Sequence, residues 1–293
     1  MSASPETWTV LRVLTWTAER FGQEGLDSPR LDAELLLAHC LGVERVRLYM
    51  DHEKPLLPEE LGRYRELVRR RLRREPVAYI TGTREFWSLP LVVSDRVLVP
   101  RPETETLVEQ ALRIVGELGL DAPLIVDVGT GSGAIALALA SELPRARVLA
   151  LDVDPAALEV AAENARRLEL ELTPLRGDLL DALPPDTGPL DLVVANLPYV
   201  ASAELDGLQP EVARWEPRRA LDGGPDGLDP LRRLVPQAAA RLGGGRALVL
   251  EVGAVQAPVA TRLCAEHGFE AARVVQDLAG LDRVVCALRP PRP

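Results

Sequence analysis

The 293-residue sequence has few cysteines, few histidines and no long hydrophobic run, and each shortage excludes a class of protein. Its three cysteines lie far apart and form no CxxC pair, and only three histidines accompany them, so we expect neither a disulfide scaffold nor a metal site. No apolar run reaches the roughly 18 residues of a membrane helix, and the first residues lack the pattern of a signal peptide. These shortages predict a reduced, cytoplasmic protein that does not span a membrane.

An excess of positive charge is also missing. The net charge is −10, and residues 1–90 are neutral, with 14 basic and 14 acidic side chains, so the remainder carries the whole negative charge. Binding to a phosphate backbone needs excess lysine and arginine, so this composition disfavours direct binding of nucleic acid. Because 47% of the residues are hydrophobic, a sizeable core is expected and disorder is excluded for the chain as a whole.

The order of sequence patterns predicts three regions. Residues 1–75 place apolar residues at helical spacing over 8–21, 29–41 and 58–74, which predicts a small helical bundle. Residues 76–100 contain short β-prone runs at 78–83 and 91–94, so we expect a β-hairpin linker.

Residues 101–293 alternate between strand and helix patterns, with a first helix opening near Pro100. Apolar runs of strand length occur at 124–128, 148–152, 190–195, 247–252 and 283–288, and the helical patterns cover 134–143, 155–170 and 258–268. Continuous apolar strands alternating with helices are typical of a parallel sheet that is buried on both faces, so the fold class is α/β and doubly wound.

A glycine-rich turn, Asp127–Gly133, follows the first strand of this region and opens a helix. Glycine allows a tight turn and close approach of a ligand, although an ordinary strand–helix turn has the same pattern. Asp152 ends the second strand, where a carboxylate can accept both hydroxyls of a ribose. Gly177-Asp178 closes a third strand, which precedes the run at 190–195, and Asp178 is there within reach of an adenine. Asp154 is a helix cap before Pro155. Together these features predict a nucleoside site.

Asn196-Leu197-Pro198-Tyr199 follows the fourth strand, at the edge where open α/β sheets bind ligands. On its own, an Asn-to-Pro turn with an anchoring tyrosine explains this segment equally well.

Both segments resemble motifs of methyltransferases. The GxGxG spacing with Asp127 resembles motif I of class I S-adenosylmethionine-dependent methyltransferases, whose acid can face the ammonium group of the cofactor. Asn196–Tyr199 resembles the (Asn/Asp)-Pro-Pro-(Tyr/Phe) motif of methyltransferases that modify planar amide or amino nitrogens, with Leu197 in place of the first proline. The resemblance implies a Rossmann-like, mostly parallel seven-stranded sheet. It also implies cofactor contacts from Asp127, Gly129, Thr130, Gly131, Ser132, Gly133, Asp152, Asp178, Leu179 and Asn196.

Further segments are similar, in order, to the bacterial peptide chain release factor glutamine methyltransferases. They are residues 28–34, 75–82, 85–87, 100–105, 216–217 and 223–228. This resemblance implies methyl transfer from S-adenosyl-L-methionine to the side-chain amide of the glutamine in the Gly-Gly-Gln motif of class I release factors, with S-adenosyl-L-homocysteine as product. The catalytic and substrate-binding residues would be Asn196, Leu197, Pro198 and Tyr199, with Arg101 and Glu103 as further substrate contacts. Residues 1–75 would recognise the release factor, residues 101–293 would catalyse transfer, and we expect a monomer.

Three alternatives stay open on the sequence alone. A ribosomal-protein glutamine methyltransferase shares the Asn-Pro-Pro-Tyr pattern but not the Arg101–Glu105 run, and the negative charge disfavours an adenine-amine methyltransferase on nucleic acid. A non-enzymatic binding module would not need an intact set of site residues. The arginines of residues 63–74 fit a solvated helix face better than a contact with release factor or RNA.

Overall fold

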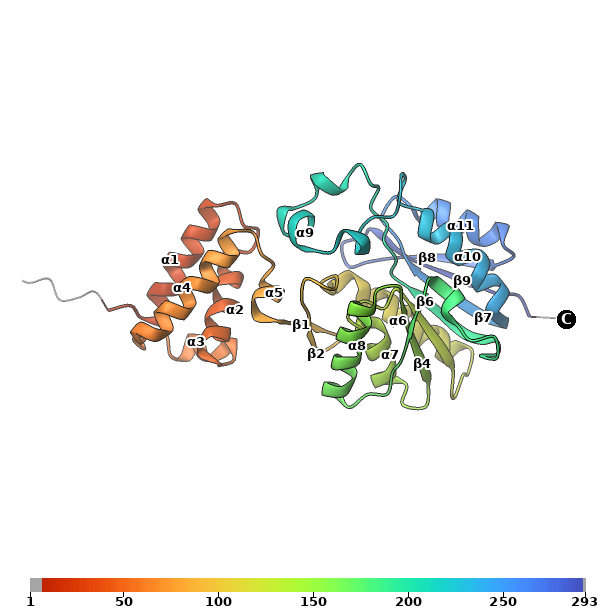
Figure 1. Ribbon diagram of the computed structural model, residues 1–293, viewed down its shortest axis with the longest axis horizontal. Helices are drawn as coiled ribbons and strands as arrows, with labels where there is room; N and C mark the ends of the chain where they lie inside the picture. The colour runs from red at the N-terminus through yellow and green to blue at the C-terminus, as the bar shows by residue number, and fades with distance from the viewer. Residues whose placement is uncertain (1–6, 292–293) are drawn as a thin grey trace, which may run out of the picture. The chain divides into compact units, whose positions relative to one another are not determined.

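The computed structural model describes residues 7–291, which form two compact units (Figure 1). The first, here the helical unit, comprises residues 7–82 together with Pro210–Trp215. The second, the sheet unit, comprises residues 83–209 and 216–291. No helix among the described residues is long and apolar enough to cross a membrane.

In the helical unit, apolar side chains from the first five helices meet in one core. Phe21, Leu36 and Leu37 have no exposed surface, and Tyr64 and Val68 close the core from a third helix. The helices are α1(Val10–Gln23), α2(Pro29–Leu41), α3(Arg45–Met50), α4(Pro58–Leu72), α5(Val77–Thr81) and α9(Pro210–Trp215). The three predicted helices of this region are confirmed.

The run at residues 78–83 is helical for most of its length, so the prediction of a strand there is wrong. Pro76 precedes α5, its carbonyl accepts from the Tyr79 and Ile80 N–H groups, and Gly82 ends the helix in the left-handed region. Burial of Ala78, Tyr79 and Ile80 against α2 and α4 outweighs the β-propensity of the run. The compact helical unit therefore extends to Gly82.

The arginine-rich helix α4 is only partly a solvated face. Arg71 is buried, and its guanidinium contacts Asp32 at 2.8 Å and Glu211 at 2.8 Å. Arg74 also binds Glu211, and Arg70 binds Glu75. Arg71 therefore joins α2 and α9 to α4, whereas Arg63, Arg65, Arg69 and Arg73 are exposed.

In the sheet unit, the described strands form one hairpin and one seven-stranded sheet of order β5-β4-β3-β6-β7-β9-β8. The hairpin pairs β1(Thr83–Phe86) with β2(Leu89–Val92). In the sheet, β9 is antiparallel to both neighbours and the other pairs are parallel. Its strands are β3(Leu124–Val128), β4(Arg147–Asp152), β5(Thr173–Arg176), β6(Leu190–Ala195), β7(Leu242–Glu251), β8(Glu270–Gln276) and β9(Asp282–Leu288).

Helices cover both faces of this sheet (Figure 1), each over its own hydrophobic cluster. One face packs against α6(Glu105–Glu117), α7(Ala134–Glu142) and α8(Pro155–Leu168), and the other against α10(Asp229–Arg241) and α11(Ala257–Glu266). Short 3₁₀ helices η1(Pro102–Thr104), η2(Leu179–Ala182), η3(Leu205–Gly207) and η4(Arg218–Ala220) lie in the connections. The predicted doubly wound, mostly parallel α/β fold is confirmed.

Candidate functional site

A pocket of about 320 Å³ opens at the carboxyl ends of the parallel strands. The chain order places β3 between β4 and β6, so the strand order reverses at β3, and open α/β sheets bind ligands at such a reversal. The walls of the pocket include most of the predicted cofactor residues, namely Gly129, Thr130, Gly131, Ser132, Asp152, Asp178, Leu179 and Asn196.

The glycine turn adopts a backbone that other residues rarely adopt. Gly129, Gly131 and Gly133 have φ angles of 75°, 55° and 82°. A Cβ on Gly129 would lie 3.0 Å from the Leu197 Cδ2, so a side chain there would press on the Asn196–Tyr199 segment. Glycine at position 129 therefore allows the glycine turn to pack closely against the Asn196–Tyr199 segment.

Asp152 has a fixed carboxylate in the pocket wall. Its Oδ2 accepts the Gly131 N–H and its Oδ1 accepts the Asp154 N–H, both at 2.9 Å. Burial raises the pKa of Asp152, while these two hydrogen bonds lower it. A carboxylate has about four acceptor positions, so about two stay available to a ligand. The Asp154 side chain accepts the Ala156 N–H, as a helix cap does.

Asp127 lies behind the glycine turn and has no exposed surface. The Thr130 hydroxyl donates to its Oδ2 at 2.6 Å, whereas its buried Oδ1 has no partner among the described residues. Burial raises the pKa of Asp127 to about 7. Asp127 is not one of the described residues that line the pocket, but its unpaired oxygen provides an acceptor beneath the turn.

Asp178 and Leu179, which follow β5, both line the pocket. The exposed carboxylate of Asp178 forms an ion pair with Arg233 from α10, and both residues line the pocket. Leu179 has a φ of 52° and joins the hydrophobic cluster under the pocket floor. The Asp178 side chain is therefore already partnered, and Leu179 offers an apolar contact.

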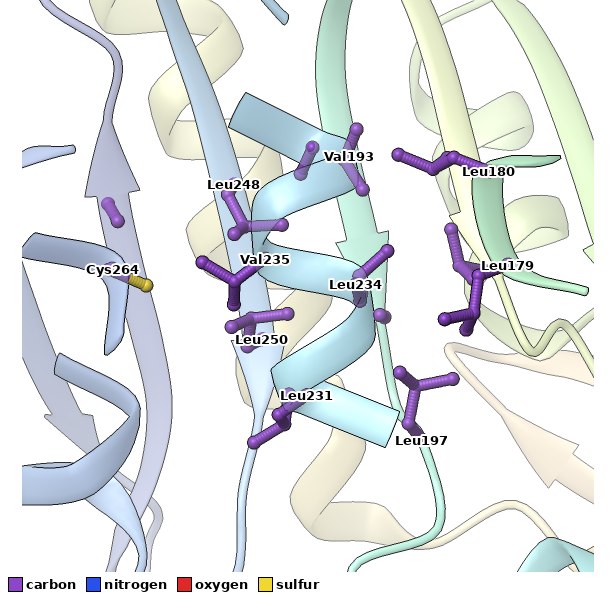
Figure 2. Close-up of a cluster of buried hydrophobic side chains, with 14 of the residues drawn as sticks. Leu179, Leu180, Val193, Leu197, Leu231, Leu234, Val235, Leu248, Leu250 and Cys264 are labelled. Atoms are coloured by element: carbon purple, nitrogen blue, oxygen red, sulfur yellow. The ribbon is translucent and has the colours of Figure 1, made fainter. Parts of the chain in front are cut away.

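Asn196, Leu197 and Pro198 also line the pocket, directly after β6. The Asn196 Nδ2 donates to the Thr104 Oγ1 at 3.2 Å. Leu197 is 6% exposed and belongs to the cluster that contains Leu179 and Leu231 (Figure 2). The leucine side chain therefore anchors the segment in the core at the position where the family pattern has proline.

The 221–228 loop holds the backbone of this segment. The Gly223 N–H donates to the Val200 carbonyl at 2.8 Å, and a Cβ on Gly223 would lie 2.7 Å from the Pro198 carbonyl oxygen. A Cβ on Gly227 would overlap the Tyr199 carbonyl oxygen, which accepts the Gln256 Nε2 at 2.9 Å. Tyr199 itself is half-buried and is not among the described pocket-lining residues.

The two predicted substrate contacts before α6 differ in position. Arg101 lines the pocket and binds the buried Glu216 at 2.5 Å. Glu103 is exposed, and the described pocket walls include its neighbour Thr104 instead. Burial raises the pKa of Glu216, whereas the charge of Arg101 and its hydrogen bond lower that pKa.

Several residues of the pocket wall belong to none of the motifs that predicted the site. Arg219 forms an ion pair with Asp154, the helix cap beside Asp152. The resemblance of residues 100–105 and 216–217 to known family segments was the one indication that these loops reach the site. The unassigned wall residues include Arg96, Val97, Leu98, Pro100, Thr104, Pro217, Arg219, Ala220, Asp222, Pro230 and Arg233. The described residues contain no group of histidine, cysteine and acidic side chains that could hold a metal ion.

Similarity to solved structures supports the fold. A methyltransferase from Pyrococcus furiosus matches with a TM-score of 0.50 and 14% identity, over 69% of this chain and 89% of its own. The Thermus thermophilus 16S rRNA N2 G1207 methyltransferase matches with a TM-score of 0.51 and 20% identity, over 71% of this chain and 49% of its own. At these identities the likeness concerns the fold alone.

Sequence comparison identifies the family. Residues 12–82 match the PrmC N-terminal domain and residues 125–215 match a methyltransferase domain. The release factor glutamine methyltransferase of Geobacter sulfurreducens is 44% identical over 97% of this chain and 98% of its own length. That of Rhodopirellula baltica is also 44% identical, over 95% of both chains. The family predicted from the sequence is confirmed: the chain belongs to the release factor glutamine methyltransferases, which are S-adenosylmethionine-dependent enzymes.

Proposed function

We propose that this enzyme methylates the side-chain amide nitrogen of the glutamine in the Gly-Gly-Gln motif of class I release factors. S-adenosyl-L-methionine would be the donor and S-adenosyl-L-homocysteine the product. The observation that carries the proposal is that Asn196, a side-chain amide, lines the same pocket as the glycine turn and the fixed carboxylate of Asp152. Full-length similarity to enzymes named for this reaction supports the choice of substrate.

The pocket has groups that suit each part of the cofactor. The unpaired Asp127 Oδ1 suits the ammonium group, and the free acceptor positions of Asp152 suit the ribose hydroxyls. The side chain of Leu179 and the region of Asp178 suit the adenine. When bound, the cofactor supplies a methyl group made electrophilic by its sulfonium centre.

The protein has to make a poor nucleophile react. The lone pair of an amide nitrogen is delocalised into its carbonyl, so the NH2 group must be held and polarised. Oδ1 of Asn196 and the Leu197 carbonyl would accept its two N–H groups, and the Tyr199 ring would pack on the planar amide. Pro198 keeps the preceding residue extended, which keeps that carbonyl in place. The methyl group moves from the sulfonium to the amide nitrogen, which is then acidic and releases one proton after the transfer. Catalysis is then mainly positioning and electrostatic stabilisation.

The remaining residues have proposed roles in recognition. Arg101, oriented by Glu216, and the exposed Glu103 would contact the release factor near the glutamine. The helical unit, which carries the match to the PrmC N-terminal domain, would recognise the body of the release factor. Because that substrate acts in translation, we place the enzyme in the cytoplasm. We propose a monomer that does not bind nucleic acid directly, in keeping with its net charge of −10.

The test is methyl transfer from radiolabelled S-adenosyl-L-methionine to candidate substrates. Label should enter unmodified release factor, and a Gln-to-Ala change in its Gly-Gly-Gln loop should block this incorporation. Label in duplex DNA would instead favour an adenine-amine methyltransferase. Label only in ribosomal protein from unmodified ribosomes would favour the sibling glutamine methyltransferase.

A further inference from the structure

A buried carboxylate lies beside the proposed catalytic amide. Strands β6 and β7 are parallel neighbours with Ala195 opposite Leu250, so the next residues, Asn196 and Glu251, reach the same edge of the sheet side by side. Glu251 is 2% exposed and Thr104, at the end of η1, is 4% exposed. The side chains of Thr104 and Asn196 act on the Glu251 carboxylate as hydrogen-bond donors and thereby lower its pKa. These three side chains therefore form one polar group, with Thr104 and Asn196 in the pocket wall and the buried Glu251 behind them.

The directions of these hydrogen bonds follow from the chemistry of the groups. An ionised carboxylate only accepts, so the Thr104 hydroxyl has to donate its single proton to Glu251. The Thr104 oxygen can then only accept from Asn196, in agreement with the Nδ2 to Oγ1 distance of 3.2 Å. With its NH2 group directed to Thr104 and Glu251, the amide presents Oδ1 on the opposite side. A neutral residue at position 251 would let the hydroxyl turn round and the amide flip.

The charge of Glu251 is poorly compensated. Its Oε2 has no partner among the described residues. Arg283 of β9, the cation that interacts with this carboxylate, is paired with Asp277 at 3.0 Å, while Glu103 and Tyr199 also interact electrostatically with the carboxylate. Burial raises the pKa of Glu251 to about 7, and the hydrogen bonds from Thr104 and Asn196 and the charge of Arg283 lower it. Glutamine would fit the same space without a buried charge, so packing alone does not require glutamate.

We propose that Glu251 is a positioning residue which, through Thr104, fixes Asn196 with its Oδ1 towards the methyl-accepting nitrogen and strengthens that acceptor by its negative charge. The proposal rests on the proposed function of Asn196. Because the carboxylate has to be ionised, the rate of transfer from the bound complex should rise as pH increases through about 7.

The test is single-turnover methyl transfer to release factor between about pH 6 and pH 9, with cofactor affinity measured by calorimetry. Glu251→Gln should lower the rate by about 10- to 100-fold, as expected for loss of one charge-assisted hydrogen bond, and should abolish the rise near neutral pH. Cofactor affinity should stay within about twofold, because Glu251 is not among the described residues that line the pocket. Thr104→Val should reproduce these changes, Thr104→Ser should restore the rate and pH profile, and the double variant Glu251→Gln/Thr104→Val should be no slower than Thr104→Val.

Asp191→Asn is the matched control. Asp191 is a partly buried carboxylate at the other end of β6, bound to the Leu124 N–H and to Arg246. Its loss should lower stability but leave the pH profile unchanged. A Glu251→Gln enzyme with the wild-type rate and the wild-type pH profile would overturn the proposal, and so would a Thr104→Val enzyme of full activity. Absence of transfer by the wild-type enzyme would instead contradict the proposed function itself.

Discussion

Replacing Gly227 with alanine should damage the catalytic segment from outside the pocket. Gly227 is buried, has a φ of 75°, and leaves no room for a Cβ beside the Tyr199 carbonyl oxygen. Gln256 donates to this oxygen at 2.9 Å and to the Gly227 carbonyl at 3.2 Å. An added methyl group has to displace the Tyr199 backbone or the Gln256 amide, and either movement disturbs the Asn196–Tyr199 segment.

The size of the effect follows from two contributions. Alanine in the left-handed region costs about 1–2 kcal/mol. Loss of the two Gln256 hydrogen bonds adds about 1 kcal/mol each, so Gly227→Ala should destabilise the protein by about 3–4 kcal/mol. Gly280 has the same φ of 75°, but a Cβ added to it would meet no atom within 4 Å, so Gly280→Ala should show only the first contribution.

Thermal unfolding and methyl-transfer assays separate the two contributions. For a unit of this size, a difference of about 2 kcal/mol between the variants is a difference of about 4–8 °C in Tm. Gly227→Ala should also lose most of its turnover below its Tm, whereas Gly280→Ala should keep it. Equal Tm values for the two variants, together with full turnover of Gly227→Ala, would refute the role assigned to the 221–228 loop.

Three further outcomes are expected. Asp152→Ala should abolish calorimetric binding of S-adenosyl-L-methionine, at about 1.5–3 kcal/mol per lost charged hydrogen bond, while the exposed Asp186→Ala should bind normally; unchanged affinity in a folded Asp152 variant would remove it from the site. Asn196→Ala should lower kcat by about 100-fold with little change in cofactor affinity, and a near-normal rate would mean that Tyr199 or backbone groups do the positioning. Burial raises the pKa of Asp127 from 3.8 to about 7, so between these pH values the folded protein binds a proton that the unfolded chain does not, and stability falls as pH rises through them. The free energies of unfolding of wild type and Asp127→Asn, measured by denaturation, should diverge over this range and differ by a constant amount above it.

The strands and the site residues at their carboxyl ends could be predicted because each is marked by neighbouring residues in the sequence. The runs at 124–128 and 190–195 match β3 and β6 residue for residue, since a strand buried on both faces needs a largely apolar sequence. The glycine turn, Asp152 and Asn196 were found because each follows such a strand. Parallel strands end at one edge, so these three residues converge in one pocket.

Features that depend on tertiary contacts could not be predicted. The β-prone run at 78–83 became α5 because a helix buries Tyr79 and Ile80 against α2 and α4. Nothing local distinguishes Arg71, buried between Asp32 and Glu211, from the exposed arginines beside it. Glu251 was overlooked because its importance comes from the register of β7 against β6, which brings it beside Asn196.

The most direct test of the central claim is peptide mapping by mass spectrometry of release factor incubated with the enzyme and S-adenosyl-L-methionine. The account predicts one methyl group, on the glutamine of the Gly-Gly-Gln motif, with wild-type enzyme, and almost none with Asn196→Ala in the same time. A methyl group on another residue, or equal methylation of that glutamine by the Asn196→Ala enzyme, would contradict it.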